Sequence, residues 1–77
     1  MALPRLTFVH DGVQALHDPT GLHVGNFKWI NGQWKFKAIG YGPAGQVMPG
    51  DGPLTDRHNT CVAHLDVAWV QAQFFQE

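Results

Sequence analysis

The sequence predicts an α+β fold: a four- or five-stranded antiparallel β-meander with one C-terminal α-helix packed on one sheet face. Three observations predict it. Turn signals recur at even spacing through the first two thirds of the chain, an Asn-Gly pair separates two alternating segments, and the last third carries a helical apolar stripe. The 77 residues suit a single domain, residues 1–77, with a marginal core.

Short strands and their turns account for the first part of the meander. Turn residues at 10–12, 18–21, 31–32 and 42–45 bound runs that are rich in apolar residues. The segment 18–21 has proline at its second position and glycine at its fourth, as a type I turn prefers. A short edge strand is expected at 46–48, and the rest of 42–55 is expected to be a loop.

The hairpin of residues 26–41 gives the strongest local signal. Asn31 and Gly32 suit a two-residue type I′ turn, because both tolerate positive φ. That turn pairs Trp29 with Trp34 and Lys28 with Lys35. Alternation then gives one aromatic face and one face that bears lysines. The aromatic face comprises Phe27, Trp29, Trp34, Phe36 and Ala38.

Residues 56–75 are predicted to form the helix, with Thr55 or Asp56 as its cap. A helical projection gathers one apolar stripe, which is expected to pack on the aromatic face. The competing interpretation is a strand in which residues 61–69 alternate, but the helical pattern persists further, to residue 75. The stripe comprises Cys61, Val62, Leu65, Ala68, Trp69, Ala72 and Phe75. The core should centre on Phe27, Trp29, Trp34, Phe36, Leu65 and Trp69.

A second apolar stripe on the same helix consists of Ala63, Val67, Val70 and Phe74. Its spacing of four, three and four is that of packed helices, so it predicts a self-association or partner surface. The alternative is that the N-terminal residues or the 42–55 loop cover it.

The other face of the hairpin carries three of the five basic residues, Lys28, Lys35 and Lys37. Tyr41 points to that face as well. Basic strands with an aromatic residue can follow a phosphate backbone, which predicts an anion-binding or nucleic-acid-binding surface. Lysine is also the ordinary solvent-facing residue of a strand, which is the plainer interpretation.

Other groupings carry weaker signals. His58, Cys61 and His64 would share one side of a helix and could hold zinc, although their spacing matches no standard zinc module. Cys61 and His64 could also form a nucleophile pair, but the sequence supplies no oxyanion hole. The glycines of 40–45 match a dinucleotide-binding spacing without the helix that such a site needs. No cofactor is predicted.

The composition indicates the expected cellular location and the ligands that the chain can attract. One cysteine, no signal peptide and no apolar run long enough for a membrane span favour a cytoplasmic protein that does not use a membrane. Net charge is −1, so any affinity for nucleic acid must come from a local patch. The first functional hypothesis is a non-catalytic, homo-oligomeric interaction module with a protein partner. The second is an anion or nucleic-acid binder, and the third is a small metal- or histidine-dependent enzyme.

Overall fold

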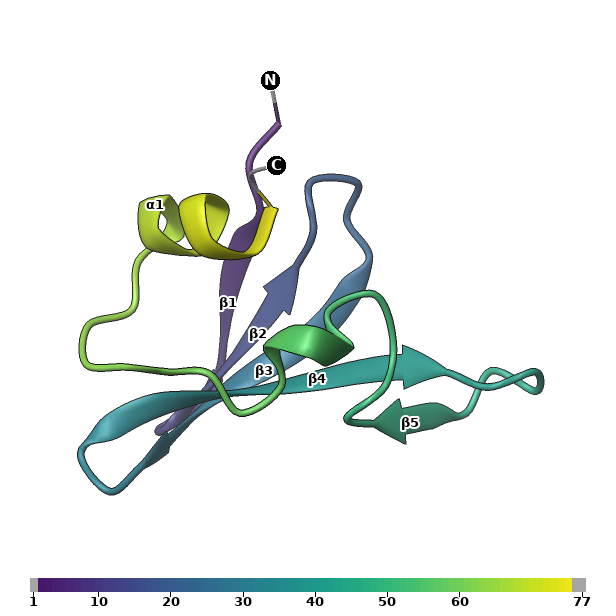
Figure 1. The fold of residues 1–77 in the computed structure, drawn as a ribbon, viewed down its shortest axis with the longest axis horizontal. Helices are drawn as coiled ribbons and strands as arrows, with labels where there is room; N and C mark the ends of the chain where they lie inside the picture. The colour runs from purple at the N-terminus through teal and green to yellow at the C-terminus, as the bar shows by residue number, and fades with distance from the viewer. Residues whose placement is uncertain (1, 76–77) are drawn as a thin grey trace.

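The computed structural model describes residues 2–75 and has the α+β architecture that the sequence predicts (Figure 1). Five antiparallel strands follow one another across the sheet, and a sixth short strand pairs with the fourth. A nine-residue helix follows near the C-terminus. The strands are β1 (Arg5–His10), β2 (Val13–His17), β3 (His23–Ile30), β4 (Gln33–Tyr41), β5 (Val47–Pro49) and β6 (Cys61–Val62). The helical elements are η1 (Thr55–Arg57), α1 (Val67–Val70) and η2 (Gln71–Phe75).

The β3–β4 hairpin has the predicted turn and register. Asn31 and Gly32 have φ values of 53° and 80°, the positive values that a type I′ turn requires. Trp29 pairs with Trp34 and Lys28 with Lys35, as predicted. The two indole rings meet edge to face, with centroids 5.4 Å apart. The turn and the alternation therefore fix this part of the sheet locally.

The outer edge of β4 is occupied by several segments in succession. β5 pairs with its C-terminal end, and β6 pairs with Trp34 and Lys35 at its N-terminal end. Between them, the Ala38 N–H donates to His58 Nδ1 at 3.0 Å, so a side chain stands in for a strand. The Phe36 N–H donates to the Thr60 carbonyl at 2.8 Å. The chain after η1 therefore lies along β4 from His58 to Val62.

The helix is shorter than predicted, because residues 55–66 serve this edge. The predicted helix 56–75 is wrong over its first half, where η1, a turn at residues 58–59 and β6 lie instead. The helix begins after Asp66, whose Oδ1 accepts from the Trp69 N–H at 2.8 Å. The competing strand interpretation holds for Cys61–Val62, and the helical one holds for the last nine described residues.

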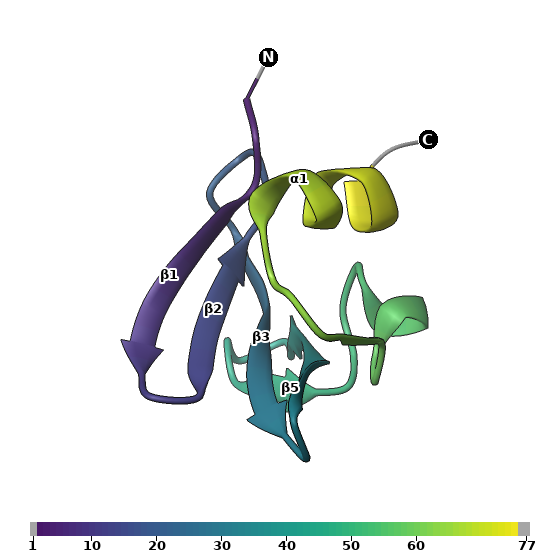
Figure 2. The same cartoon turned by 90° about the vertical axis from the view of Figure 1, so that its left-hand side faces the viewer.

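The core lies between the helix and one face of the sheet (Figure 2). Phe74 of the helix packs on Phe27 and Phe36, with ring centroids 5.8 Å and 4.8 Å away. A Cβ at Gly25 would overlap the Phe36 ring, so glycine lets that ring lie across β3. The buried cluster comprises Leu16, Val24, Phe27, Phe36, Ala38, Leu54, Val70 and Phe74.

Most of the predicted core centre is confirmed, with one correction. Phe27 and Phe36 are fully buried, and Trp34, Leu65 and Trp69 are partly buried against the cluster. Trp29 is 49% exposed. It lies next to the hairpin turn, one position from the end of β3. Among the aromatic pairs of residues 2–75, only the Trp34 ring packs on it.

None of the helices in residues 2–75 is long and apolar enough to cross a membrane.

Candidate anion-binding face

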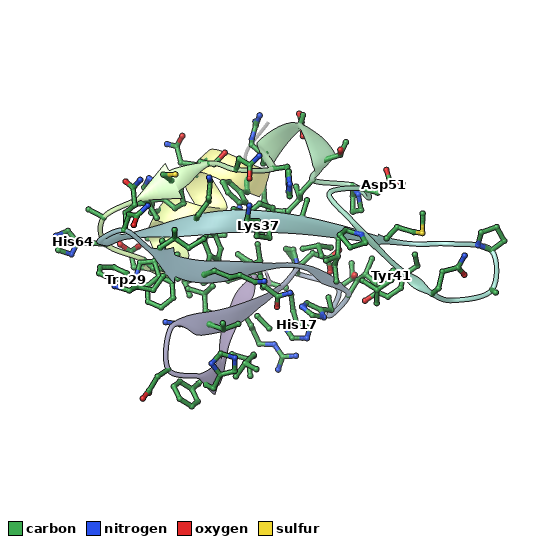
Figure 3. All side chains as sticks on the ribbon, turned by 90° about the horizontal axis from the view of Figure 1, so that it is seen from below. His17, Trp29, Lys37, Tyr41, Asp51 and His64 are labelled. Atoms are coloured by element: carbon green, nitrogen blue, oxygen red, sulfur yellow. The ribbon has the colours of Figure 1, made fainter. Side chains whose placement is uncertain are left out.

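The sheet face opposite the helix gathers most of the chain's positive charge. We call it the basic face and define it by Arg5 of β1, His17 of β2, His23 and Lys28 of β3, and Lys35 and Lys37 of β4. The registers place these residues on one side: Arg5 lies opposite His17, and Lys28 lies opposite Lys35. Figure 3 views the molecule from below and labels His17, Lys37 and Tyr41.

A β-bulge brings His23 onto this face. Strict alternation along β3 would put His23 on the same side as Phe27. The register shifts after Leu16, so His17 pairs with His23 and Val24 is left without a partner. Val24 is buried in the core, while the His23 and His17 rings stack with centroids 5.0 Å apart. His23 Nε2 also lies 3.0 Å from the Asn26 Oδ1.

The surroundings of His17 are unfavourable to its charged form. Partial burial lowers the pKa of His17, and the neighbouring His23 and Arg5 lower it further. Asp18 acts in the opposite direction but is the weakest of these influences. The buried Nδ1 atom of His17 has no hydrogen-bond partner within the described chain. His17 is therefore held in its neutral form near pH 7, and the formal positive charge at this corner comes from Arg5.

The three lysines lie as the hairpin register predicts. Lys28 is exposed and stands directly across from Lys35, an arrangement that is unfavourable for like charges. Lys37 donates from Nζ to Asn59 Oδ1 at 2.8 Å, which orients its side chain. Tyr41 is 47% exposed, and its hydroxyl donates to the His23 carbonyl at 3.2 Å. Tyr41 thus lies beside the histidine pair.

Acidic groups are kept out of the sheet. None of the six described strands contains an aspartate or a glutamate. Asp18 accepts from Thr20 and Leu22 within its own turn, and the Thr20 hydroxyl is the main cause of its lowered pKa. The fifth basic residue, Arg57, donates from Nε to the Gln73 carbonyl at 3.1 Å and lies 3.5 Å from Asp56. Arg57 therefore contacts the helix and does not contribute to the basic face.

The predicted helical seam is not a surface. Val70 and Phe74 are buried in the chain's own core, and Val67 is half-buried. Ala63 is exposed but precedes the helix, so it does not share a helical face with them. The helix begins at Val67 rather than near residue 56, and the sheet takes the stripe that was expected to face outward. The assignment of Val70 and Phe74 to a partner interface is therefore corrected.

The three weak candidates for metal ligands, His58, Cys61 and His64, do not lie together. His58 Nδ1 accepts the Ala38 N–H, Cys61 lies in β6, and His64 lies in an exposed bend. The helical spacing that would bring the three together does not exist, since the helix starts later. For the same reason Thr55 and Asp56 do not cap this helix and lie in η1 instead. Within residues 2–75, no group of three or more potential metal ligands gathers and no pocket opens.

The basic face was only partly visible in the sequence. Alternation identified Lys28, Lys35 and Lys37, whereas Arg5, His17 and His23 were not assigned to the site. Arg5 and His17 alternate with Leu6 and Leu16, a pattern that could have placed them on the outer face. The family models, the curated proteins and the solved structures with which the chain was compared give no match to it.

Proposed function

We propose that the chain is a non-catalytic binding module that holds single-stranded nucleic acid across the basic face. The observation that carries the proposal is the separation of charge in the fold. Four of the five basic residues and the stacked His17–His23 pair share a sheet face whose strands contain no carboxylate. Such a surface attracts phosphates locally although the whole chain has a net charge of −1.

The opposed lysines support a ligand with repeated negative charge. Lys28 and Lys35 face each other across the ladder, where opposite charges would stabilise the sheet and like charges destabilise it. A phosphate placed between the two ammonium groups would convert that repulsion into two favourable contacts. Successive phosphates of one nucleic-acid strand could then contact Lys37, further along β4, and Arg5 on β1.

Aromatic rings at one end of the basic face favour single-stranded nucleic acid over other polyanions. Tyr41 is half-exposed there and is tied by its hydroxyl to the His23 backbone. Unpaired bases stack on such rings, and stacking is worth roughly 1–3 kcal/mol per base in single-strand-binding proteins. Base pairing in a duplex hides the faces of the bases, so a duplex would gain only the charge contacts.

The test is the salt dependence of binding to a fluorescently labelled single-stranded oligonucleotide, followed by anisotropy. Each phosphate neutralised contributes a slope of about −0.7 in a log–log plot of affinity against salt, so four cations predict roughly −3. The double variant Lys28→Gln/Lys35→Gln should lose about half of that slope and bind more weakly. The matched control, Ala68→Glu/Gln73→Glu, makes the same change in net charge on two exposed helix positions and should keep the slope.

Three results would count against the proposal. The first is no binding at low salt. The second is an equal loss of affinity in both double variants, which would indicate net charge rather than the basic face. The third is a preference for duplex or for anionic lipid vesicles over the single strand.

We place the protein in the cytoplasm, which the single exposed thiol of Cys61 supports.

A further inference from the structure

Within residues 2–75, no strand lies beside the outer edge of β1. β1 ends the order of strands and pairs with β2 alone among the described elements, as Figure 2 shows from the side. Its outward N–H and C=O groups therefore have no strand of the described chain beside them. Phe8 is 69% exposed and Val9 is also exposed, so the free edge carries large apolar side chains.

The two edges of the sheet differ in how they are protected. The β4 edge is occupied by β5, by the His58 ring and by β6, and β5 itself is three residues long and ends in Pro49. β1 has six residues with no lysine or proline inside it. Its protective features are the charged Arg5 at its start and the bulge at Val9, which limits regular pairing to residues 5–8.

We propose that β1 pairs with β1 of a second copy of this chain, antiparallel, about a two-fold axis that passes midway between the two Thr7 residues. A two-fold axis perpendicular to the sheet pairs residues of equal parity and continues both faces across the junction. Centred on Thr7, it sets Leu6 beside Phe8 of the second copy, and the same contact repeats on the other side of the axis. The two exposed Phe8 rings would thereby gain apolar neighbours.

The alternative registers are less favourable on this sequence. Centring the axis on Leu6 brings Pro4, which has no N–H, opposite Phe8. Registers of unequal parity set Arg5 opposite Phe8 and join the core face of one copy to the basic face of the other. The Thr7-centred register sets Arg5 opposite the bulge residue Val9 and keeps the two arginines apart. Self-complementarity is the reason to choose a second copy over an unrelated strand.

This inference stands on the β1 edge and does not depend on nucleic-acid binding. If both hold, the two basic faces lie on the same side of one continuous sheet, because the axis is perpendicular to it. A longer single strand could then cross both copies.

The oligomeric state of the full chain tests the edge directly. Sedimentation equilibrium should show a dimer that dissociates on dilution, and Phe8→Lys should abolish it. Because Phe8 is exposed, the far-ultraviolet circular dichroism and melting temperature of this variant should stay close to those of the parent. Val47→Lys, on the exposed residue of the opposite edge, should leave the dimer intact. A monomeric parent at high concentration, or a Phe8→Lys dimer of unchanged stability, would overturn the proposal.

Cysteine crosslinking tests the register. In a Cys61→Ser background, Thr7→Cys should form a disulfide between copies, since paired residues have Cα atoms about 4.5–5.5 Å apart and disulfides span that distance. Thr20→Cys, in the exposed turn between β2 and β3, should not crosslink at the same protein concentration. Equal crosslinking at both positions, or none at residue 7 while the dimer persists, would refute pairing about Thr7.

Discussion

The β3–β4 hairpin and residues 55–75 show two different ways in which this sequence determines structure. In the hairpin, the Asn31-Gly32 turn fixes the register, and the alternation of side chains follows from it. In residues 55–75 the apolar periodicity indicated a helix from 56 onward, yet the helix begins at Val67. The hairpin depends on neighbours in sequence, whereas the later segment depends on the unpaired edge of β4.

Pairing of the backbone groups along this edge of β4 outweighs the helical propensity of residues 56–66, because buried backbone groups must be hydrogen-bonded. Residues 58–62 supply the partners of β4 at Trp34, Phe36 and Ala38. Only after this stretch is the chain free to coil, and Asp66 then caps the start of the helix. Val70 and Phe74, which were expected to face outward, are buried at the centre of the core, while Leu65, Trp69 and Phe75 of the predicted core stripe pack at its margin.

The largest expected effect comes from Val70→Asp. Val70 is fully buried between helix and sheet, and an unpaired carboxylate there should destabilise the fold by about 3–5 kcal/mol. Urea unfolding followed by circular dichroism should show a chain that is largely unfolded without urea. Ala68→Asp, exposed in the first turn, should be close to neutral. A folded Val70→Asp protein that merely fails to associate would restore the outward-facing stripe.

The next largest effect is expected from His58, whose ring accepts a hydrogen bond from β4 where no strand pairs with it. His58→Ala leaves the Ala38 N–H without its acceptor, and the expected cost is about 1–3 kcal/mol in free energy of unfolding. Amide hydrogen exchange at Ala38 should also become faster. His64→Ala, at an exposed bend, is the control and should change neither quantity. Equal stabilities of the two variants would show that the edge of β4 does not require this contact.

The start of the helix can be located with two aspartates. Asp66→Ala removes the side chain that accepts from Trp69 and should cost about 1 kcal/mol. Asp56→Ala should cost less, because Asp56 is 3.5 Å from Arg57 in an exposed ion pair. Urea midpoints of the two variants make the comparison. The reverse order would support a helix that starts near residue 56.

The smallest effect is the dependence of stability on pH. The pKa of His17 is lowered in the folded chain, so between that value and the ordinary histidine pKa of about 6.5 the unfolded chain binds more protons. Stability from this group is therefore complete above about pH 6.5 and declines as pH falls through the window. His17→Gln should flatten the decline of melting temperature with acidity, and His64→Gln should not. An unchanged slope in His17→Gln would contradict the assignment.

The sequence predicted the fold class, the hairpin and the three lysines, because each follows from periodicity or from a turn of known geometry. It did not predict the bulge at Val24 that turns His23 outward, since bulges carry little local signal. It also placed Trp29 in the core. The helix that covers the aromatic face is too short to reach the hairpin end, and its length was decided by residues 58–62.

The most direct test of the central claim is an amide chemical-shift titration with a short single-stranded oligonucleotide. If the basic face binds it, the largest shifts should fall on residues 5, 17, 23, 28, 35 and 37 and on Tyr41. The helix of residues 67–75 should be little affected. Shifts concentrated on the helix, or spread evenly over the chain, would contradict the basic face as the binding surface.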